Sequence, residues 1–311
     1  MNTATAWRAA VATDPGLERS VNEDRVWADE TRGIFLVVDG LGGHAAGETA
    51  AETALRVIES RMSELDTQAD IEHQIRQAIT DANSRILALA DEHPEYRGMA
   101  CVLTLAVAQE ERVTIGHVGD SRLYLAWNGN LRKITSDHSP VGEQEDQGEL
   151  TEAEAMRHPR RNEVFRDVGS QPHAPDDSHF IETKSFLFRP DAALLLCSDG
   201  LSDVLTSAEI SALIEQYDGS PESTARQLVD AANAAGGKDN ISVVFVAGPD
   251  FLGSESHAML DSRPRHAITR MRPKRSHWRR ALRDMLWLVI GVILGVVLCV
   301  AVELLLPRFL H

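Results

Sequence analysis

Three aspartates stand where a run of apolar residues ends or begins. Asp39 ends such a run in "FLVVDGLGGH", Asp199 ends another in "LLLCSDGLSD", and Asp239 comes just before the run in "GGKDNISVVFV". Continuous apolar runs bounded by turn residues are typical of strands that are covered on both faces. A single aspartate of this kind is usually a turn residue. Three of them at strand ends predict that their carboxylates converge on one point.

Carboxylates gathered in this way suit a hard divalent cation. Mg²⁺ and Mn²⁺ take oxygen ligands and usually keep several waters, so a few carboxylates and a backbone carbonyl are enough. Gly40 offers that carbonyl, and a glycine lets the backbone come close to an ion without a side chain in the way. Two ions bridged by one aspartate would lower the pKa of a shared water and direct hydroxide at a phosphorus atom. The predicted chemistry is phosphoester hydrolysis.

The stretch "TDPGLERSVNEDR" contains a partner for phosphate. Arg19 has the fork of N–H groups that binds two phosphate oxygens, and Glu23 and Asp24 follow it. An arginine among acids is also typical of a surface ion pair, so the segment alone leaves both interpretations open. Asp120, in "VGDSRLYL", follows a strand-like run and offers a ligand for a further cation or forms a turn.

Strand-like and helix-like segments alternate along the chain. We expect strands at 7–13, 34–38, 100–109, 112–119, 122–127, 130–135, 185–188, 192–198 and 241–247, and helices at 47–62, 71–92, 207–217 and 221–235. Asn128-Gly129 predicts a tight hairpin turn. Residues 139–178 are polar and predict a surface excursion with a small helix near 151–158. The pattern favours an α+β fold in which one sheet packs on another with helices outside.

The C-terminal end differs from the rest of the chain. Residues 285–302 contain no charged side chain, and this apolar segment is long enough to cross the ~30 Å hydrocarbon core of a bilayer. Ten Lys and Arg residues against four acids follow Phe251, and nine of the ten precede the apolar segment, whereas residues 1–251 hold 21 against 43. The excess of positive charge before the segment places the large N-terminal part in the cytoplasm.

These features predict three parts: a catalytic domain at 1–251, a basic flexible juxtamembrane linker at 252–284 and a transmembrane helix at 285–306. Anionic lipids are expected to hold the linker close to the bilayer. We therefore expect a single-pass protein of the cell inner membrane with its catalytic domain in the cytoplasm. The acidic body argues against a nucleic-acid partner.

Three cysteines, Cys101, Cys197 and Cys299, lie singly in apolar surroundings. The absence of a CxxC spacing indicates a reducing compartment and argues against both disulfides and a zinc site.

Six stretches in order resemble the protein phosphatase 2C family, the metal-dependent Ser/Thr phosphatases, in its bacterial form. They are "GLERSVNEDR", "FLVVDGLGGH", "VGDSRLYL", "ITSDHS", "LLLCSDGLSD" and "GGKDNISVVFV", and they span residues 16–246. The resemblance implies a PP2C-like αββα sandwich of two sheets flanked by helices, with the metals in a cleft at one end. It further implies that residues 139–178 form a variable flap beside the cleft.

The resemblance also implies a role for each site residue, with two Mg²⁺ or Mn²⁺ ions and a third metal position. Asp39 would bridge the two metals, Gly40 would give its carbonyl, Asp199 and Asp239 would complete the pair, Glu23 would hold a metal-bound water, Asp120 with Asp199 would form the third position, Asp203 would support Asp199, and Arg19 would hold the substrate phosphate. Arg19, Asp39 and Asp239 are the residues expected to carry catalysis.

The chain departs from the family pattern in two places. Ala100 and Cys101 in "GMACVL" stand where the family usually has hydroxyl side chains. Leu41 follows the Asp-Gly pair, where eukaryotic members have a histidine, so the proton donor to the leaving group is either His44 or a metal-bound water.

The expected function is removal of phosphate from Ser or Thr of cytoplasmic proteins, in opposition to a Ser/Thr kinase. Two alternatives stay open. The altered "GMACVL" segment suggests a catalytically weak, membrane-anchored pseudophosphatase that binds phosphoproteins. The predicted anchor suggests a phosphoester of a lipid or small metabolite as substrate.

Overall fold

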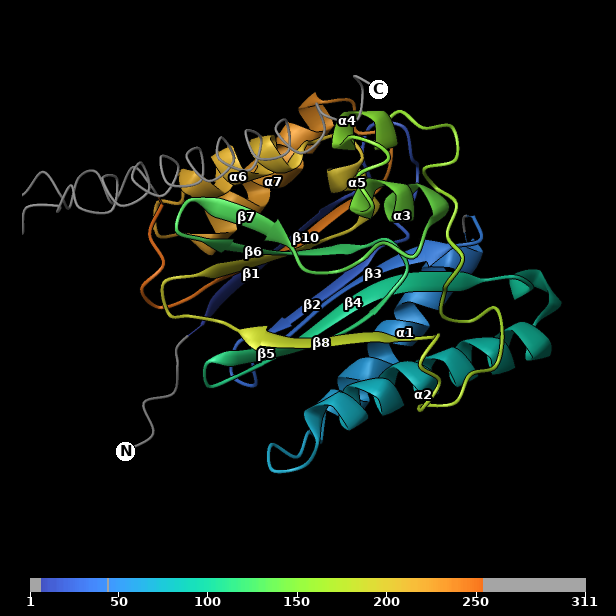
Figure 1. The fold of residues 1–311 in the computed structure, drawn as a ribbon. Coiled ribbons are helices and arrows are strands. Elements are labelled where there is room, and N and C mark those ends of the chain that lie inside the picture. Colours follow the sequence, from blue (N-terminus) through green and yellow to red (C-terminus); the bar gives the residue numbers. More distant parts are fainter. Residues whose placement is uncertain (1–6, 44, 254–311) are drawn as a thin grey trace, which may run out of the picture. The chain divides into compact units, whose positions relative to one another are not determined.

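Two antiparallel five-stranded sheets carry the fold of residues 7–43 and 45–253, the residues that this computed structural model describes (Figure 1). All of them belong to one unit, Met1–Arg263. The first sheet has the order β1 (Arg8–Asp14), β10 (Ile241–Ala247), β9 (Ala193–Cys197), β6 (Arg122–Trp127) and β7 (Asn130–Lys133). The second has the order β2 (Arg25–Asp29), β3 (Ile34–Leu41), β4 (Ala100–Gln109), β5 (Arg112–Val118) and β8 (Glu182–Leu187).

Helices cover the outer face of each sheet (Figure 1). The long helices α1 (Ala45–Ser63) and α2 (Ile71–Glu92) pack on the second sheet, and α6 (Ser207–Glu215) and α7 (Pro221–Ala234) pack on the first. Shorter helices are η1 (Pro94–Tyr96), α3 (Pro140–Asp146), α4 (Glu152–Ala155) and α5 (Asp199–Ser202). The predicted αββα sandwich is confirmed.

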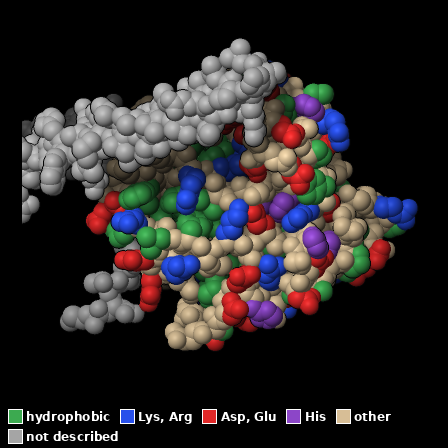
Figure 2. Space-filling model, viewed as in Figure 1, with side chains coloured by type: hydrophobic (Ala, Val, Ile, Leu, Met, Phe, Trp, Pro, Cys, Tyr) green, Lys and Arg blue, Asp and Glu red, His purple; other side chains and the backbone are tan. Residues whose placement is uncertain are grey.

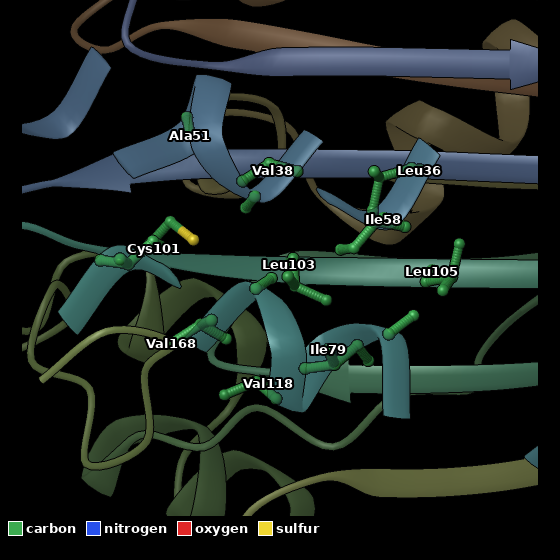
Figure 3. Packing of buried hydrophobic residues seen from close by; sticks show 14 of the residues in the cluster. Leu36, Val38, Ala51, Ile58, Ile79, Cys101, Leu103, Leu105, Val118 and Val168 are labelled. Atoms are coloured by element: carbon green, nitrogen blue, oxygen red, sulfur yellow. The ribbon is translucent and has the colours of Figure 1, made fainter. Parts of the chain in front are cut away.

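The continuous apolar strands are buried on both faces, as their composition predicts. Along β3, Leu36 and Val38 point into the core beneath α1 and α2, which Figure 3 shows, while Phe35 and Val37 point into the core between the sheets. Because side chains alternate along a strand, a strand between two apolar layers needs apolar residues at every position. The same alternation divides β9 between the inner core and the core under α6 and α7.

Most predicted elements are confirmed, and α2 has the predicted limits. Four elements were not predicted: β2, η1, α3 and α5. All five residues of β2 are half-buried, so its sequence, "RVWAD", lacks the apolar run that marks the central strands. The helix α3 belongs to the polar segment 139–178, where we expected one helix, α4.

The surface of this unit mixes charges of both signs. Figure 2 shows acidic and basic side chains interspersed on the face viewed in Figure 1, so the acidic excess of residues 1–251 is not a single patch on that face. Hydrophobic side chains gather near the ends of β6 and β8, where Trp127 and Leu187 are exposed (Figure 2).

Among the residues that the structure describes, no helix has the length and apolar character needed to span a bilayer. The predicted transmembrane helix, the predicted linker beyond residue 253, His44 and Cys299 lie outside the described residues.

Candidate metal centre

The aspartates predicted to converge all stand at one end of the sandwich. Asp39 lies near the end of β3, Asp120 follows β5, Asp199 follows β9, and Asp239 precedes β10. In antiparallel sheets the end of one strand lies beside the start of its neighbour, so these positions meet at the same edge. The structure therefore brings Asp39, Asp120, Asp199 and Asp239 together, and their roles as ligands stay a prediction.

Burial and mutual repulsion make these carboxylates hard to ionise. Burial raises the pKa of Asp39 well above its usual value, and the charges of Asp24, Asp199, Asp120 and Asp239 raise it further. Burial also raises the pKa of Asp199 well above its usual value, and the charges of Asp203 and Asp120 raise it further. A bound divalent cation would remove this penalty because it supplies the missing opposite charge.

Asp24 is a member of this site that the sequence prediction left out of its ligand set. Its side chain is buried, one oxygen accepts a hydrogen bond from Ser198 Oγ at 2.8 Å, and Oδ1 has no hydrogen-bond partner. Burial raises its pKa to about 7. A buried oxygen without a partner is costly, and it fits a ligand for an ion or for an ion's water. We call Asp24, Asp39, Asp120, Asp199 and Asp239 the carboxylate group.

The signal for Asp24 was present but incomplete. It directly precedes β2, so it is a strand-end aspartate like the other members of the group. Because β2 has no continuous apolar run, the rule that identified Asp39 and Asp199 did not reach it.

Gly40 is required by close packing of three chain segments. A Cβ at this position would meet the carbonyl oxygens of Gly47 at 2.3 Å and of Glu23 at 2.8 Å. The expected reason for this glycine was access of its carbonyl to an ion, and the structure adds a steric reason from its neighbours. The Glu23 carboxylate lies against Gly47 in the first turn of α1, since a Cβ there would meet Glu23 Oε2 at 2.1 Å. Helix N-termini favour negative charge.

Arg19 lies at the exposed edge of the carboxylate group. Its Nη2 donates a hydrogen bond to Asp239 Oδ2 at 2.7 Å, and the two side chains are 48% and 27% exposed. The structure thus shows the ion pair that we considered from sequence, but its partner is a predicted metal ligand. An arginine in this place can meet a phosphate that approaches the site from solvent.

Two polar residues within the recognised motifs fasten the sheets together at this end. Asn240 Oδ1 accepts from the backbone N–H of Glu23 at 2.8 Å, and its Nδ2 donates to the carbonyl of Val21 at 2.9 Å. Ser198 Oγ accepts from the backbone N–H of Ser242 in the first sheet at 3.0 Å and donates to Asp24, next to β2 of the second sheet, at 2.8 Å. Sequence reasoning did not single out Asn240 or Ser198, although each is adjacent to a predicted ligand.

A cavity of ≈ 20 Å³, about the room that one water needs, separates Asp120 from Asp199. Burial, together with the charges of Asp137 and Asp203, raises the pKa of Asp120 to about 7. Asp203 lines the same cavity, donates its N–H to the Asp199 carbonyl at 2.7 Å, and accepts from Arg161 Nε at 2.8 Å. Since Arg161 belongs to the segment 139–178, that segment closes one side of the predicted third metal position.

The departure at "GMACVL" lies in the core behind the site. Cys101 pairs with Gly40 across β3 and β4, and its side chain packs in the apolar cluster that Figure 3 shows, together with Val168. Burial raises the pKa of the Cys101 thiol well above its usual value. The position of the missing hydroxyl is therefore filled by apolar packing, and no member of the carboxylate group is displaced by it.

A second polar cluster lies apart from the predicted ligands. Within the described ranges, one group of three metal-ligand side chains has its ligand atoms all within 4.8 Å of one another, and its members are His117, His138 and Glu182, here called the histidine group. Both ring nitrogens of His117 already have partners, at 2.9 Å and 3.1 Å. Lys184 forms an ion pair with Glu182. Because Lys184 already balances the charge of Glu182, the carboxylate group stays the predicted site for a metal.

Comparison with known proteins identifies the family of this chain. Residues 18–236 match the family model described as protein phosphatase 2C. The serine/threonine phosphatase stp of Listeria welshimeri is 35% identical over 244 residues, which cover 76% of this chain and 94% of that protein. The structure of the Mycobacterium tuberculosis serine/threonine phosphatase PstP/Ppp is similar with a TM-score of 0.70 and 31% identity, covering 78% of this chain and 98% of that one.

The catalytic domain of PstP in complex with two manganese ions is also similar, with a TM-score of 0.69 and 30% identity over 78% of this chain and 97% of that one. The manganese in that relative agrees with the predicted cofactor of this chain, Mg²⁺ or Mn²⁺. On its sequence, its two-sheet architecture and the family match, this chain belongs to the protein phosphatase 2C family.

Proposed function

We propose that this chain is a protein Ser/Thr phosphatase that needs Mg²⁺ or Mn²⁺. The observation that carries the proposal is the carboxylate group itself: five aspartates from both sheets gather at one end of the sandwich, closely enough for the charges of the other four to raise the pKa of Asp39, and a buried oxygen of Asp24 has no hydrogen-bond partner. Family membership supports the same activity.

The residues of the chain have distinct tasks in this proposal. Asp39, Asp199 and Asp239, with the Gly40 carbonyl, would hold two ions, and Asp120 with Asp199 would hold a third. When bound, such ions supply a hydroxide at neutral pH for direct attack on phosphorus. Arg19, at the exposed edge, would orient the phosphate of phosphoserine or phosphothreonine.

Hydrolysis of a phosphothreonine peptide tests the proposal. Activity should require Mn²⁺ or Mg²⁺ and should fall on the order of 10³-fold in Asp39→Asn and in Asp239→Asn, because several kcal/mol of charge stabilisation are lost. Asp91→Asn, at an exposed position on α2, is the matched control and should keep full activity. Unchanged turnover by both site variants in the presence of a chelator would refute the proposal.

Neither the site nor the comparisons support the alternative of a catalytically weak pseudophosphatase. Each predicted aspartate ligand is present, and the "GMACVL" change is absorbed by core packing. The remaining alternative is that the substrate is a phosphoester of a lipid or a small metabolite. Comparing hydrolysis rates on phosphopeptides with those on lipid headgroups and small phosphoesters distinguishes it from a protein phosphatase.

We further propose that the phosphatase is held at the cytoplasmic face of the cell inner membrane by residues 285–306 and that it opposes a Ser/Thr kinase there. The length of the uncharged segment and the nine basic residues before it support the tether. The full chain should sediment with membranes and resist carbonate extraction, whereas a chain ending at residue 253 should not. A full chain released by carbonate would contradict the tether.

A further inference from the structure

Residues 119–122 contain the predicted ligand Asp120. A second short segment, residues 136–139, forms hydrogen bonds with both ends of residues 119–122. At one end the backbone N–H of His138 donates to the Gly119 carbonyl at 2.7 Å, and His138 Nδ1 accepts from the Gly119 N–H at 3.0 Å. At the other end Asp137 Oδ2 accepts from Arg122 Nη2 at 2.6 Å and Nε at 2.9 Å. The segment that holds Asp120 is therefore fixed on both sides of the ligand.

The hydrogen bonds at the Arg122 end belong to a buried ion-pair network. The side chains of Arg122 and Asp137 are 10% and 4% exposed, and Arg122 Nη2 also donates to Glu145 Oε2 at 2.9 Å. Glu145 belongs to α3, the first helix of the segment 139–178. Buried charges that are paired in this way are costly to separate, so the Arg122 end of residues 119–122 is held rigidly.

Gly119 has no freedom to move away from His138. Its φ is +106°, a conformation that favours glycine, and a Cβ there would meet Val102 Cγ1 at 2.1 Å. Gly119 is thus enclosed between β4 on one side and the His138 ring on the other. A change in the His138 ring acts directly on the residue before Asp120.

The opposite side of His138 faces the segment 139–178. Its carbonyl accepts from the Phe165 N–H at 2.9 Å, and its Nε2 lies 3.3 Å from Arg166 Nη1. Since Nδ1 accepts the Gly119 N–H, a neutral ring carries its proton on Nε2, and Arg166 makes a contact there without accepting that proton. A protonated Nε2 is not a metal ligand, which agrees with a structural histidine group.

We propose that His138 is a positioning residue for Asp120: through Nδ1 it holds Gly119, and so it sets the Asp120 carboxylate at the third metal position and connects that position to the segment 139–178. The inference rests on the proposed function, because Asp120 is a ligand only if the carboxylate group holds metal. Outer partners that orient a ligand typically change metal affinity by about 10- to 100-fold.

Two substitutions of His138 distinguish the roles of its two ring nitrogens. In His138→Asn the amide oxygen can take the place of Nδ1 and accept the Gly119 N–H, whereas in His138→Gln the amide reaches toward the place of Nε2. Calorimetric titration of the metal-free full chain with Mn²⁺ measures the affinity of each site, including the predicted third position, without any turnover. We expect His138→Asn to bind like the unchanged protein and His138→Gln to lose about tenfold at the third position.

A matched control is His173→Gln, which changes a half-buried histidine of the same segment that pairs with Asp177 and stacks on Phe180. It should leave Mn²⁺ affinity unchanged. Equal weakening by His138→Asn and His138→Gln, or no weakening by His138→Gln, would overturn the inference. If His138→Gln does not fold, His138→Asn alone decides, since weaker Mn²⁺ binding by it contradicts the assigned role of Nδ1.

The Asp120→Asn background distinguishes this inference from the proposed function. There His138→Gln should have no further effect on Mn²⁺ binding, and a second loss of equal size would show that His138 acts through another ligand. If Asp120→Asn by itself leaves Mn²⁺ binding unchanged while Asp39→Asn abolishes it, the phosphatase proposal stands and the third position with its positioning residue is wrong.

Discussion

The carboxylate group and the histidine group are both buried and polar, but they differ in how their charges are balanced. Burial and neighbouring acids raise the pKa of Asp39 well above its usual value. Glu182 is also partly buried, which alone would raise its pKa, yet hydrogen bonds from Lys184 and Ser136 hold that pKa below its usual value. Burial therefore does not mark a metal centre by itself. Of the two groups, the carboxylate group is the one that contains a buried oxygen without a hydrogen-bond partner, Asp24 Oδ1.

The largest difference between substitutions in the two groups should appear in metal binding. Asp39→Asn removes the predicted bridging ligand, so we expect the affinity for the tightest Mn²⁺ to fall by about 100-fold or more in calorimetric titration. Thr104→Val, which removes a hydroxyl partner of His117 Nδ1, should leave Mn²⁺ binding unchanged. Loss of Mn²⁺ in the Thr104 variant would reverse the assignment of the two groups.

The carboxylate group should also make the metal-free domain less stable as the pH rises. The pKa of Asp24 is raised from 3.8 to about 7, so the folded protein binds this proton more tightly than the unfolded chain. The stabilisation is fully present below pH 3.8 and is lost as the pH rises to about 7. Between these values the unchanged protein should lose on the order of a few kcal/mol of unfolding free energy relative to Asp24→Asn.

Urea unfolding at pH 4 and pH 7, in chelator and with Mn²⁺, measures this loss. With Mn²⁺ bound the fall should disappear, because the ion replaces the proton as the partner of the carboxylates. The same slope in both proteins in chelator would mean that Asp24 is not the group that titrates.

A substitution next to the histidine group should lower the stability of the domain. Thr104 is fully buried, and Thr104→Val leaves a ring nitrogen of His117 without its hydroxyl partner. We expect a loss of about 1–3 kcal/mol in unfolding free energy. Thr114→Val on β5, whose hydroxyl pairs with Ser185 at the surface, is the control and should change stability by less than about 0.5 kcal/mol.

The same contrast explains how far the sequence could predict this molecule. Strands buried on both faces, such as β3, β4, β9 and β10, contain apolar runs that mark them without ambiguity, and their ends located three ligands. The edge strand β2 is half-buried at each position, so neither it nor the orphaned oxygen of Asp24 could be anticipated.

The partners of the site residues lie too far along the chain to be predicted from local pattern. His138 meets Gly119 at a separation of 19 residues, Ser198 meets Asp24 at 174, and Arg19 meets Asp239 at 220. Such pairs depend on sheet order, which hydrophobic periodicity does not specify. The order of the motifs along the sequence was enough to identify the family. The hydrogen bonds that orient each carboxylate could be found only from the folded structure.

A small effect on stability should come from the exposed edge of the carboxylate group. The Arg19–Asp239 pair is largely open to solvent, so Arg19→Gln should change the unfolding free energy of the metal-free domain by less than about 1 kcal/mol. If Arg19 orients phosphate, the same variant should raise the KM for a phosphothreonine peptide about tenfold while Mn²⁺ affinity stays within a few-fold. Peptide kinetics at saturating Mn²⁺ measure the first effect and calorimetry the second. An unchanged KM would reduce Arg19 to the surface ion pair that its sequence context also allowed, and a large loss of Mn²⁺ affinity would show that its task is to hold Asp239 instead of the substrate.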